Sequence, residues 1–278
     1  NDVGAGALSV SSLAVQAAGS VLLDNTGDIS FVAGIVSGPG NSFTLTNEDN
    51  GFAIGSGIDG LTGITTANNT SGNTGSITLS TTTGSINVAQ NLKTGDASGV
   101  SSPTSGSITL TAGTGSVFGT QTPETGSATS NNAGAGTATS GNIVLTGGEI
   151  SDDGAATASG AFTVLIGDTS GGATNRDGSL FATSTGSGNA GEIVISTTKD
   201  LRVDTLNSTD LDTTTVDVSI TAAAGTLTIL AANNLDQDNV ILTADDVTIN
   251  NVITGSGTIL LQPLTTTRSI GLGGGAGD

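Results

Sequence analysis

The chain has 278 residues, of which only 10% are charged, and its five Lys plus Arg against 24 Asp plus Glu give a formal net charge of −19. Five scattered cations cannot neutralise a phosphate backbone or hold an anionic lipid surface, so the charge argues against nucleic-acid and membrane-surface partners. The absence of Cys excludes disulfides, thiol nucleophiles and zinc–thiolate sites. Aromatic residues reach only 2% while Gly contributes 44 residues, which favours a thin core repeated many times over one bulky core.

Short alternations of apolar and polar residues run along the whole chain. Ile77-x-Leu79 followed by Ile86-x-Val88 has the period of two that is typical of half-buried strands, with Gly84 at the corner between the two arms. In each unit the second arm begins seven to nine residues after the first. The equivalent pairs, in chain order, are Val21/Leu23 with Ile29/Phe31, Phe43/Leu45 with Phe52/Ile54, Ile108/Leu110 with Val117, Ile143/Leu145 with Ile150, Ile193/Ile195 with Leu201/Val203, Val218/Ile220 with Leu227/Ile229, and Val240/Leu242 with Val247/Ile249.

The spacing between these units indicates stacking. It is 22 residues from Val21 to Phe43, 22 from Val218 to Val240 and 19 from Val240 to Ile259. A parallel β-solenoid requires such a returning phrase because each coil must offer its neighbour the same ladder of side chains, whereas an antiparallel sandwich does not. A third apolar position follows several units, at Ile35, Leu92, Leu206, Leu235 and Val252. We therefore predict one all-β segment over residues 1–278, a parallel β-helix with roughly triangular coils of about 19–25 residues.

Two regions, residues 119–140 and 154–190, break this rhythm and are rich in Gly, Ser, Thr and Ala. We predict loop insertions there, because insertions in a solenoid lie on one side of a coil. Their composition is that of a flexible spacer, while loops in such positions also hold binding functions, and both interpretations stay open. Within the second region, Ala161–Asp168 is expected to form a strand of its own.

Several longer phrases resemble a known family. "GSVLLDNTGDISFVAG", "IGSGIDGLTGITT", "GSITLSTTTGSI" and "LQPLTTTRSIGLGGGAGD" are similar to repeats of large bacterial exported proteins of the filamentous haemagglutinin type. The resemblance implies a right-handed parallel β-helix shaft at the bacterial cell surface that serves adhesion, aggregation or a structural coat. The secretion region that opens such proteins is not recognisable, and "NDVGAGALSV" has neither Met nor signal-peptide features. We therefore expect an interior or processed segment of a longer extracellular protein.

Candidate chemical groups are mostly carboxylates. Hydrolysis of a glycan requires two carboxyl groups about 5 to 9.5 Å apart in one cleft. The chain lacks the Trp and Tyr platforms that sugar-cleaving clefts usually offer, so we expect solvated turn residues and no catalytic site. The candidates are Asp152 with Asp153, then Asp204, Asp210, Asp212 and Asp217, and then Asp236, Asp238, Asp245 and Asp246.

Two stretches have features of calcium loops. Asn175–Ser179, "NRDGS", contains an Asn-x-Asp-Gly kernel without the Glu of the EF-hand pattern, and "GLGGGAGD" ends at Asp278 without a repeat. We expect turns at both places and assign no metal site or cofactor, although calcium stays an open ligand.

These observations favour a structural or adhesive surface protein, a shaft or fibre subunit without catalytic activity. The expected partners are other copies or neighbouring surface proteins, end to end or side by side, together with glycans or another cell surface. A binding module that uses its insertions to recognise glycan or calcium is the main alternative. A glycan-acting β-helix enzyme and an ice-binding solenoid are further alternatives. An ice-binding solenoid needs Thr at the same strand positions in most coils, and it is disfavoured because Asn87 and Arg202 stand at corresponding positions.

Overall fold

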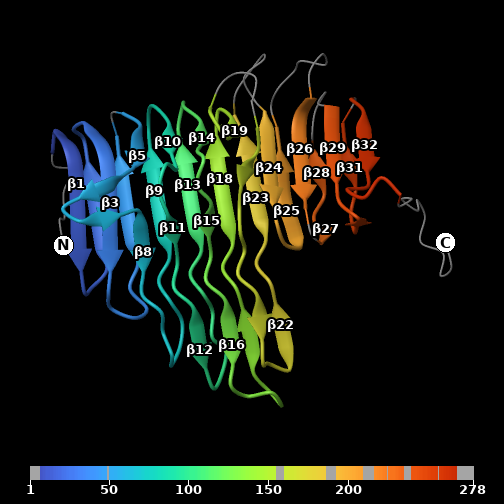
Figure 1. The fold of residues 1–278 in the computed structure, drawn as a ribbon, viewed down its shortest axis with the longest axis horizontal. Helices are drawn as coiled ribbons and strands as arrows, with labels where there is room; N and C mark the ends of the chain where they lie inside the picture. The colour runs from blue at the N-terminus through green and yellow to red at the C-terminus, as the bar shows by residue number, and fades with distance from the viewer. Residues whose placement is uncertain are drawn as a thin grey trace.

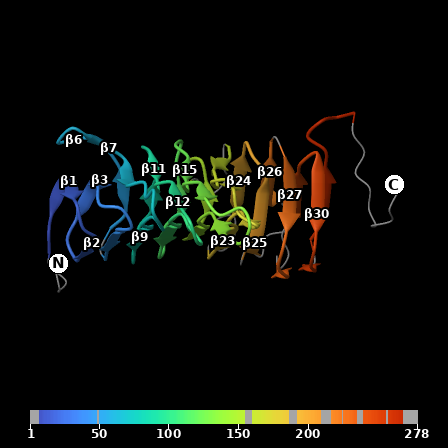
Figure 2. The ribbon, with the colours of Figure 1, turned by 90° about the horizontal axis from the view of Figure 1, so that it is seen from below.

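The computed structural model describes residues 7–48, 50–154, 160–185, 192–208, 216–223, 225–234, 239–255 and 257–267, and every regular element within them is a β-strand. The strands stack side by side along the longest axis, from β1 (Val10–Ala17) at one end to β32 (Ile259–Gln262) at the other (Figures 1 and 2). Among the described strands, pairing is parallel except in the hairpin of β6 (Ser56–Ile58) and β7 (Leu61–Thr62). The prediction of an all-β protein built on parallel sheets is confirmed.

Nine described strands form the first long sheet, and each pairs with the equivalent strand of the next unit. They are β2 (Val21–Asn25), β4 (Phe43–Asn47), β9 (Ile77–Thr81), β13 (Ile108–Ala112), β18 (Ile143–Gly147), β23 (Leu180–Ser184), β25 (Leu201–Asn207), β27 (Thr226–Ile229) and β30 (Asp246–Ile249).

Fourteen described strands form the second long sheet. Besides β1 and β32 they are β3 (Ile29–Val36), β5 (Phe52–Ile54), β8 (Ile64–Thr66), β10 (Ile86–Asn87), β11 (Leu92–Lys93), β14 (Val117–Phe118), β15 (Pro123–Glu124), β19 (Ile150–Ser151), β20 (Phe162–Thr163), β24 (Ile193–Thr197), β26 (Val216–Ala222) and β29 (Asn239–Thr243). The sheet divides after β3, which pairs with both β5 and β8. One arm continues through β10 and β14, and the other through β11 and β15.

The core is a set of aliphatic ladders between the two long sheets. Along the first sheet Ile77, Ile108 and Ile143 stand in register, and all three are fully buried. Ile86 of the second sheet and Val88, which directly follows β10, belong to the same buried cluster. Since side chains alternate between the faces of a strand, each arm contributes only one or two core residues, and stacking makes their burial continuous.

Local backbone geometry explains the turns between the arms of a unit and the burial of its third apolar position. Gly84 lies in the turn between β9 and β10 with φ +84°, and an added Cβ would meet the amide nitrogen of Gly51 at 2.2 Å. Leu92 and Leu206 are buried as the third apolar position predicts. Ile35 is instead 39% exposed, because β3 continues as one strand and alternation turns this residue outward. Val252 is exposed beside the last described strands, and Leu235 lies outside the described residues.

A side lobe projects from the stack, built by the segments 66–75, 94–106, 125–141 and 166–178 of four successive units (below the long sheets in Figure 1). Its two small parallel sheets pack around a separate core of Ala97, Ala128 and Ala138. The sheets consist of β12 (Ala97–Gly99), β16 (Ala128–Ser130) and β21 (Thr169–Ser170), and of β17 (Thr137–Thr139) and β22 (Thr174–Arg176). A further small sheet joins β28 (Asn233–Asn234) to β31 (Ile253–Thr254).

The lobe accounts for much of the sequence that breaks the rhythm. Residues 119–140 contain β15, β16 and β17, and each of these strands pairs with another unit. The described part of 154–190 contains β20 to β23. Of the strand expected at Ala161–Asp168 only Phe162–Thr163 is formed, as β20, with an isolated bridge between Leu165 and Glu124 after it. Composition indicates spacer here because Ala, Ser and Gly are poor signals for strands, yet the pairing is as regular as in the long sheets.

Each lobe segment leaves the stack and returns to it through two neighbouring stretches of chain. We call this junction the neck and the two stretches its walls, and buried hydroxyl groups link the two walls. The Thr94 hydroxyl donates to the carbonyl of Gly106 at 2.8 Å and accepts from the amide of Gly126, one unit further on, at 2.9 Å. The Thr74 hydroxyl bonds in the same way to the Gly95 carbonyl and the Gly106 amide. The hydroxyls of this neck are satisfied although they are buried, because each lies between a donor and an acceptor of the backbone.

Glycine is required beside these hydroxyls. A Cβ on Gly106 would come within 1.9 Å of the Gly75 carbonyl oxygen, and one on Gly126 would meet the Gly95 oxygen at the same distance. The recurring pairs of Thr or Ser with Gly therefore have one physical meaning. The hydroxyl crosslinks the walls, and the glycine lets the walls of neighbouring units come close enough for the bond to form.

Candidate functional site

The candidate site lies where the side lobe ends. In four successive units the chain passes through the lobe before it enters the first long sheet, but between β24 and β25 only Thr198, Lys199 and Asp200 make the connection. The last lobe segment therefore has no equivalent segment stacked on its far side among the described residues. Figure 1 shows that the lobe ends beside β22, and we call this end of the lobe the step.

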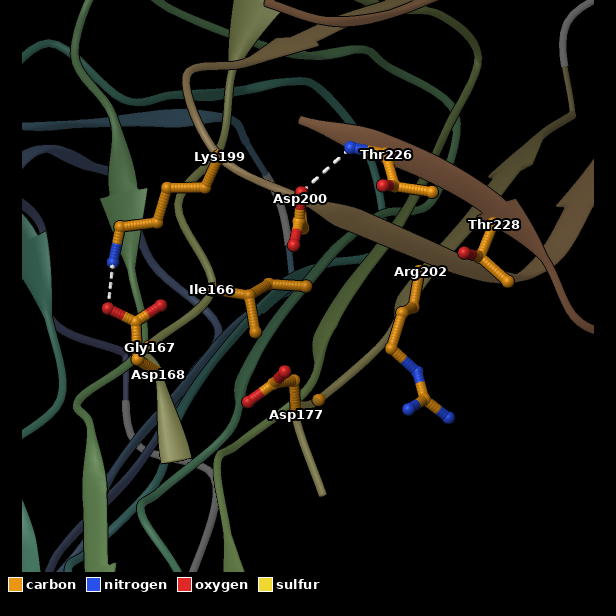
Figure 3. A pocket seen from close by; sticks show the side chains of 10 residues that line it. Ile166, Gly167, Asp168, Asp177, Lys199, Asp200, Arg202, Thr226 and Thr228 are labelled. Carbon is orange, nitrogen blue, oxygen red and sulfur yellow. Dashed lines mark hydrogen bonds and ion pairs between the residues drawn. The ribbon is translucent and has the colours of Figure 1, made fainter. Parts of the chain in front are cut away.

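A polar cavity of about 210 Å³ occupies this step (Figure 3). One wall comes from the two neck segments of the last lobe unit, and the other comes from the connection before β25, from β25 and from β27. The lining residues are Ile166, Gly167, Asp168, Asp177, Gly178, Lys199, Asp200, Arg202, Thr226 and Thr228.

The last unit also changes the chemistry of the neck. Gly167 and Gly178 donate their amides to the hydroxyls of Thr125 and Ser140, as earlier units do. The residue before each of these glycines is no longer Thr or Ser, however, but Ile166 and Asp177. The Asp177 carboxylate thus occupies the position that a Thr or Ser hydroxyl has in the earlier units. Each earlier hydroxyl accepts from an amide of the following unit, whereas this carboxylate faces the cavity.

The charged groups that line the cavity differ in the partners they already have. Lys199 Nζ and Asp168 Oδ2 form an ion pair at 2.9 Å, with the Asp168 side chain largely exposed. Asp200 Oδ1 accepts from the Thr226 amide at 2.7 Å, a contact that caps β27. Asp177 Oδ1 accepts from the Thr169 hydroxyl at 2.7 Å. These three carboxylates keep oxygen atoms available to a ligand in the cavity.

Arg202 is the unusual member of the set. It stands beside Thr228 on the outer face of the first long sheet, and Figure 3 shows it across the cavity from the Lys199–Asp168 pair. Its Nε is buried without a hydrogen-bond partner, and its guanidinium forms no ion pair with a described residue. An unpaired buried donor is destabilising unless something else accepts from it.

The sequence candidates relate to this cavity only in part. From "NRDGS", Asp177 reaches the cavity, whereas Asn175 Oδ1 accepts from the Gly172 amide in a local turn. No group of three or more side chains suited to hold a metal ion occurs within the described residues. Lys199 and Arg202 were not singled out as site residues from the sequence, although two of the chain's five basic residues within "KDLR" were a usable signal.

The other aspartates do not line this cavity. Asp152 Oδ1 accepts from the Gly160 amide at 2.8 Å, and both oxygens of Asp245 bond to Thr265 at 2.7 Å, one through its amide and one through its hydroxyl. Asp153 follows Asp152 directly, and Asp204 and Asp246 lie on β25 and β30. Outside the described residues and side chains lie Asp210, Asp212, Asp217, Asp236, Asp238 and Asp278.

A second feature that the sequence did not indicate is a pair of buried glutamates. Glu149 and Glu192 precede Ile150 and Ile193, which pair between β19 and β24, so the two carboxyl groups belong to neighbouring units. They are 2% and 5% exposed. Burial raises the pKa of Glu149, the Ser151 hydroxyl that donates to it opposes the rise, and the nearby negative charge of Glu192 adds to it.

Comparison with known protein families, curated protein sequences and solved structures finds no significant match. Within the described residues there is no helix with the length and hydropathy needed to cross a membrane.

Proposed function

We propose that the chain is a segment of a right-handed parallel β-solenoid that acts as the shaft or fibre of an exported bacterial surface protein, without catalytic activity. The observation that carries the proposal is the unbroken ladder of buried aliphatic side chains, a single cluster that includes residues from Val21 to Ala244. A core of this kind is extended along one axis, and its stability grows with each added unit. That is the property required of a shaft.

Two features support the geometry of the proposed solenoid. In the four units from β5 to β20, the first long sheet and the two arms of the second supply three strands per unit, as a roughly triangular coil would. Parallel strands joined by a crossover connection are right-handed in almost all proteins, which favours the right-handed form here.

Surface charge and end surfaces support the proposed setting and partners. A net charge of −19 keeps copies apart laterally and favours solubility outside the cell. The last described unit exposes Ile249, Ile259 and Leu260, apolar side chains that a further stacked layer would bury. We propose end-to-end contact with another copy or a neighbouring surface protein, mediated by such layers.

Immunogold microscopy of cells that produce the protein tests this function. An antibody against the side lobe is expected to decorate the cell surface or fibres that extend from it, because the lobe projects from the stack. Antibody that is first adsorbed with the purified chain is the control and should give no label. Label confined to the cell interior would contradict the proposed role.

A further inference from the structure

The two flanks of the side lobe differ in how they end. On the flank nearer β1, the first lobe segment is short, and its amide side chains cap the next unit. Asn68 Oδ1 accepts from the Asp96 amide at 2.8 Å, and Asn73 Oδ1 accepts from the Thr104 amide at 2.9 Å. On the other flank the last segment meets the cavity of the step instead. Side chains of the first segment thus bond to backbone amides of the second, whereas the last segment on the other flank faces a hollow lined by charged side chains.

Within that hollow, opposite charges share one space without pairing. Asp177 is bonded only to Thr169 among the described residues, and Arg202 makes no hydrogen bond or ion pair with any of them. Two such groups lining a cavity of about 210 Å³ can be satisfied together by a molecule that accepts from the guanidinium and donates to the carboxylate. Lys199 is already held by Asp168, so Arg202 is the principal donor left for such a molecule.

The charges around the cavity restrict the class of this molecule. An anion would face Asp168, Asp177 and Asp200 and a chain of net charge −19. A simple cation would have to approach Arg202 and Lys199. A neutral molecule with several hydroxyl groups meets neither obstacle, because a hydroxyl both donates and accepts. The cavity is smaller than the roughly 300 to 1,000 Å³ of drug-sized sites, which limits the ligand to about one sugar ring.

We propose that the cavity of the step binds one neutral hexose unit of a glycan. Arg202 donates to ring or hydroxyl oxygens, Asp177 and Asp200 accept from sugar hydroxyls, and Thr228 supplies a hydroxyl that can do either. Backbone and neck hydrogen bonds hold both walls in place before the sugar arrives, so little ordering accompanies binding. This site goes beyond the shaft function and does not depend on it, because a binding cavity would exist wherever the protein is located.

Ligand-detected NMR and calorimetry on the purified chain test the proposal. The probes are the methyl glycosides of glucose, galactose and mannose and short neutral oligosaccharides of each, with glucuronate and calcium chloride as charged comparisons. At least one neutral hexoside should bind, and the charged probes should bind at least tenfold more weakly. Absence of binding by every neutral probe, or binding of a charged probe alone, would overturn the proposal.

Variants locate the binding. Arg202→Met and Asp177→Asn should each weaken the affinity for that hexoside at least tenfold. Arg176→Met is the matched control, because it removes the same charge from β22 without touching the cavity lining, and it should bind like the parent chain. Circular dichroism checks folding, and Asp177→Asn alone locates the sugar if Arg202→Met fails to fold. Binding that neither cavity variant weakens would place the sugar elsewhere and refute the assignment.

Discussion

The long sheets and the neck of the side lobe join parallel strands by different means. Between the long sheets, aliphatic side chains such as Ile108 and Leu110 fill the space and are fully buried. In the neck the hydroxyls of Thr94 and Ser105 bridge the two walls, and the glycine after each allows neighbouring units to approach closely. The hydrophobic effect holds the first arrangement together, and satisfied polar groups hold the second. A chain poor in large apolar residues can therefore still extend its fold sideways.

Truncation in the long sheets should have the largest effect. Leu110→Ala removes a fully buried side chain from the ladder between Leu79 and Leu145, and we expect it to lower the free energy of unfolding by about 3–5 kcal/mol. Urea unfolding followed by circular dichroism measures the change. Leu22→Ala, at a largely exposed position of β2, is the control and should cost less than about 1 kcal/mol. Equal losses in the two variants would argue against the ladder.

A glycine substitution tests the close approach in the neck. Gly106→Ala places a Cβ where the Gly75 carbonyl oxygen lies, and we expect a loss of about 3 kcal/mol, with amide exchange faster mainly in the lobe. Gly19→Ala is the matched control, because nothing lies within 4 Å of its added Cβ, and it should have almost no effect. A neck that tolerates Gly106→Ala would show that neighbouring units of the neck lie further apart than described.

Removal of one hydroxyl tests the polar crosslink with little change of shape. Thr94→Val leaves the buried Gly106 carbonyl without its donor and the Gly126 amide without its acceptor, so a loss of about 1–3 kcal/mol is expected. Thr94→Ser keeps the hydroxyl and should lose less than the Val variant does. Thermal unfolding of both variants gives the comparison, and a Val variant as stable as the parent would mean that the crosslink contributes nothing.

A buried carboxyl group gives the smallest expected effect, and it depends on pH. Because burial raises the pKa of Glu149 above that of the unfolded chain, the folded state holds this proton more tightly. Its contribution favours folding below the unfolded pKa and is lost as the pH rises through the folded pKa. Glu149→Gln should therefore raise the melting temperature at pH 8 and change it little at about pH 3.5, below the ordinary Glu pKa.

The control for that variant is Glu48→Gln, which changes an exposed carboxyl group. It should leave the melting temperature nearly constant at both pH values. A Glu149→Gln variant that is less stable than the parent at pH 8 would show that the ionised form is favoured in the fold.

The sequence predicted those features of the fold that depend on the alternation of apolar and polar residues. Ile77, Leu79, Ile86 and Val88 are buried as expected, because large aliphatic residues at a period of two have few other uses in so polar a chain. The lobe was not predicted, since Ala97 and Ala128 do not stand out among many small residues. Its hydroxyl bridges also join segments roughly thirty residues apart, a separation that no local pattern indicates.

The candidate site could not be predicted from the sequence for a similar reason. Asp177 is recognisable only as part of a turn, and Arg202 only as a departure from a regular Thr array, because its neighbours in β25 are ordinary strand residues. Their proximity depends on where the lobe stops, which is set by the short connection at Thr198–Asp200. A cavity created by the end of a repeat is visible only once the repeats are stacked.

Residue-resolved amide exchange tests the central claim most directly, namely that the Gly-, Ser- and Thr-rich segments are stacked structure and not spacer. The amides of Gly106, Gly126 and Gly141 should exchange nearly as slowly as those of β13, because each is bonded to a buried hydroxyl. Exchange of these three amides at the rate of an unstructured chain, while β9 and β13 stay protected, would contradict the claim. It would remove the neck, the lobe and the wall of the proposed sugar site together.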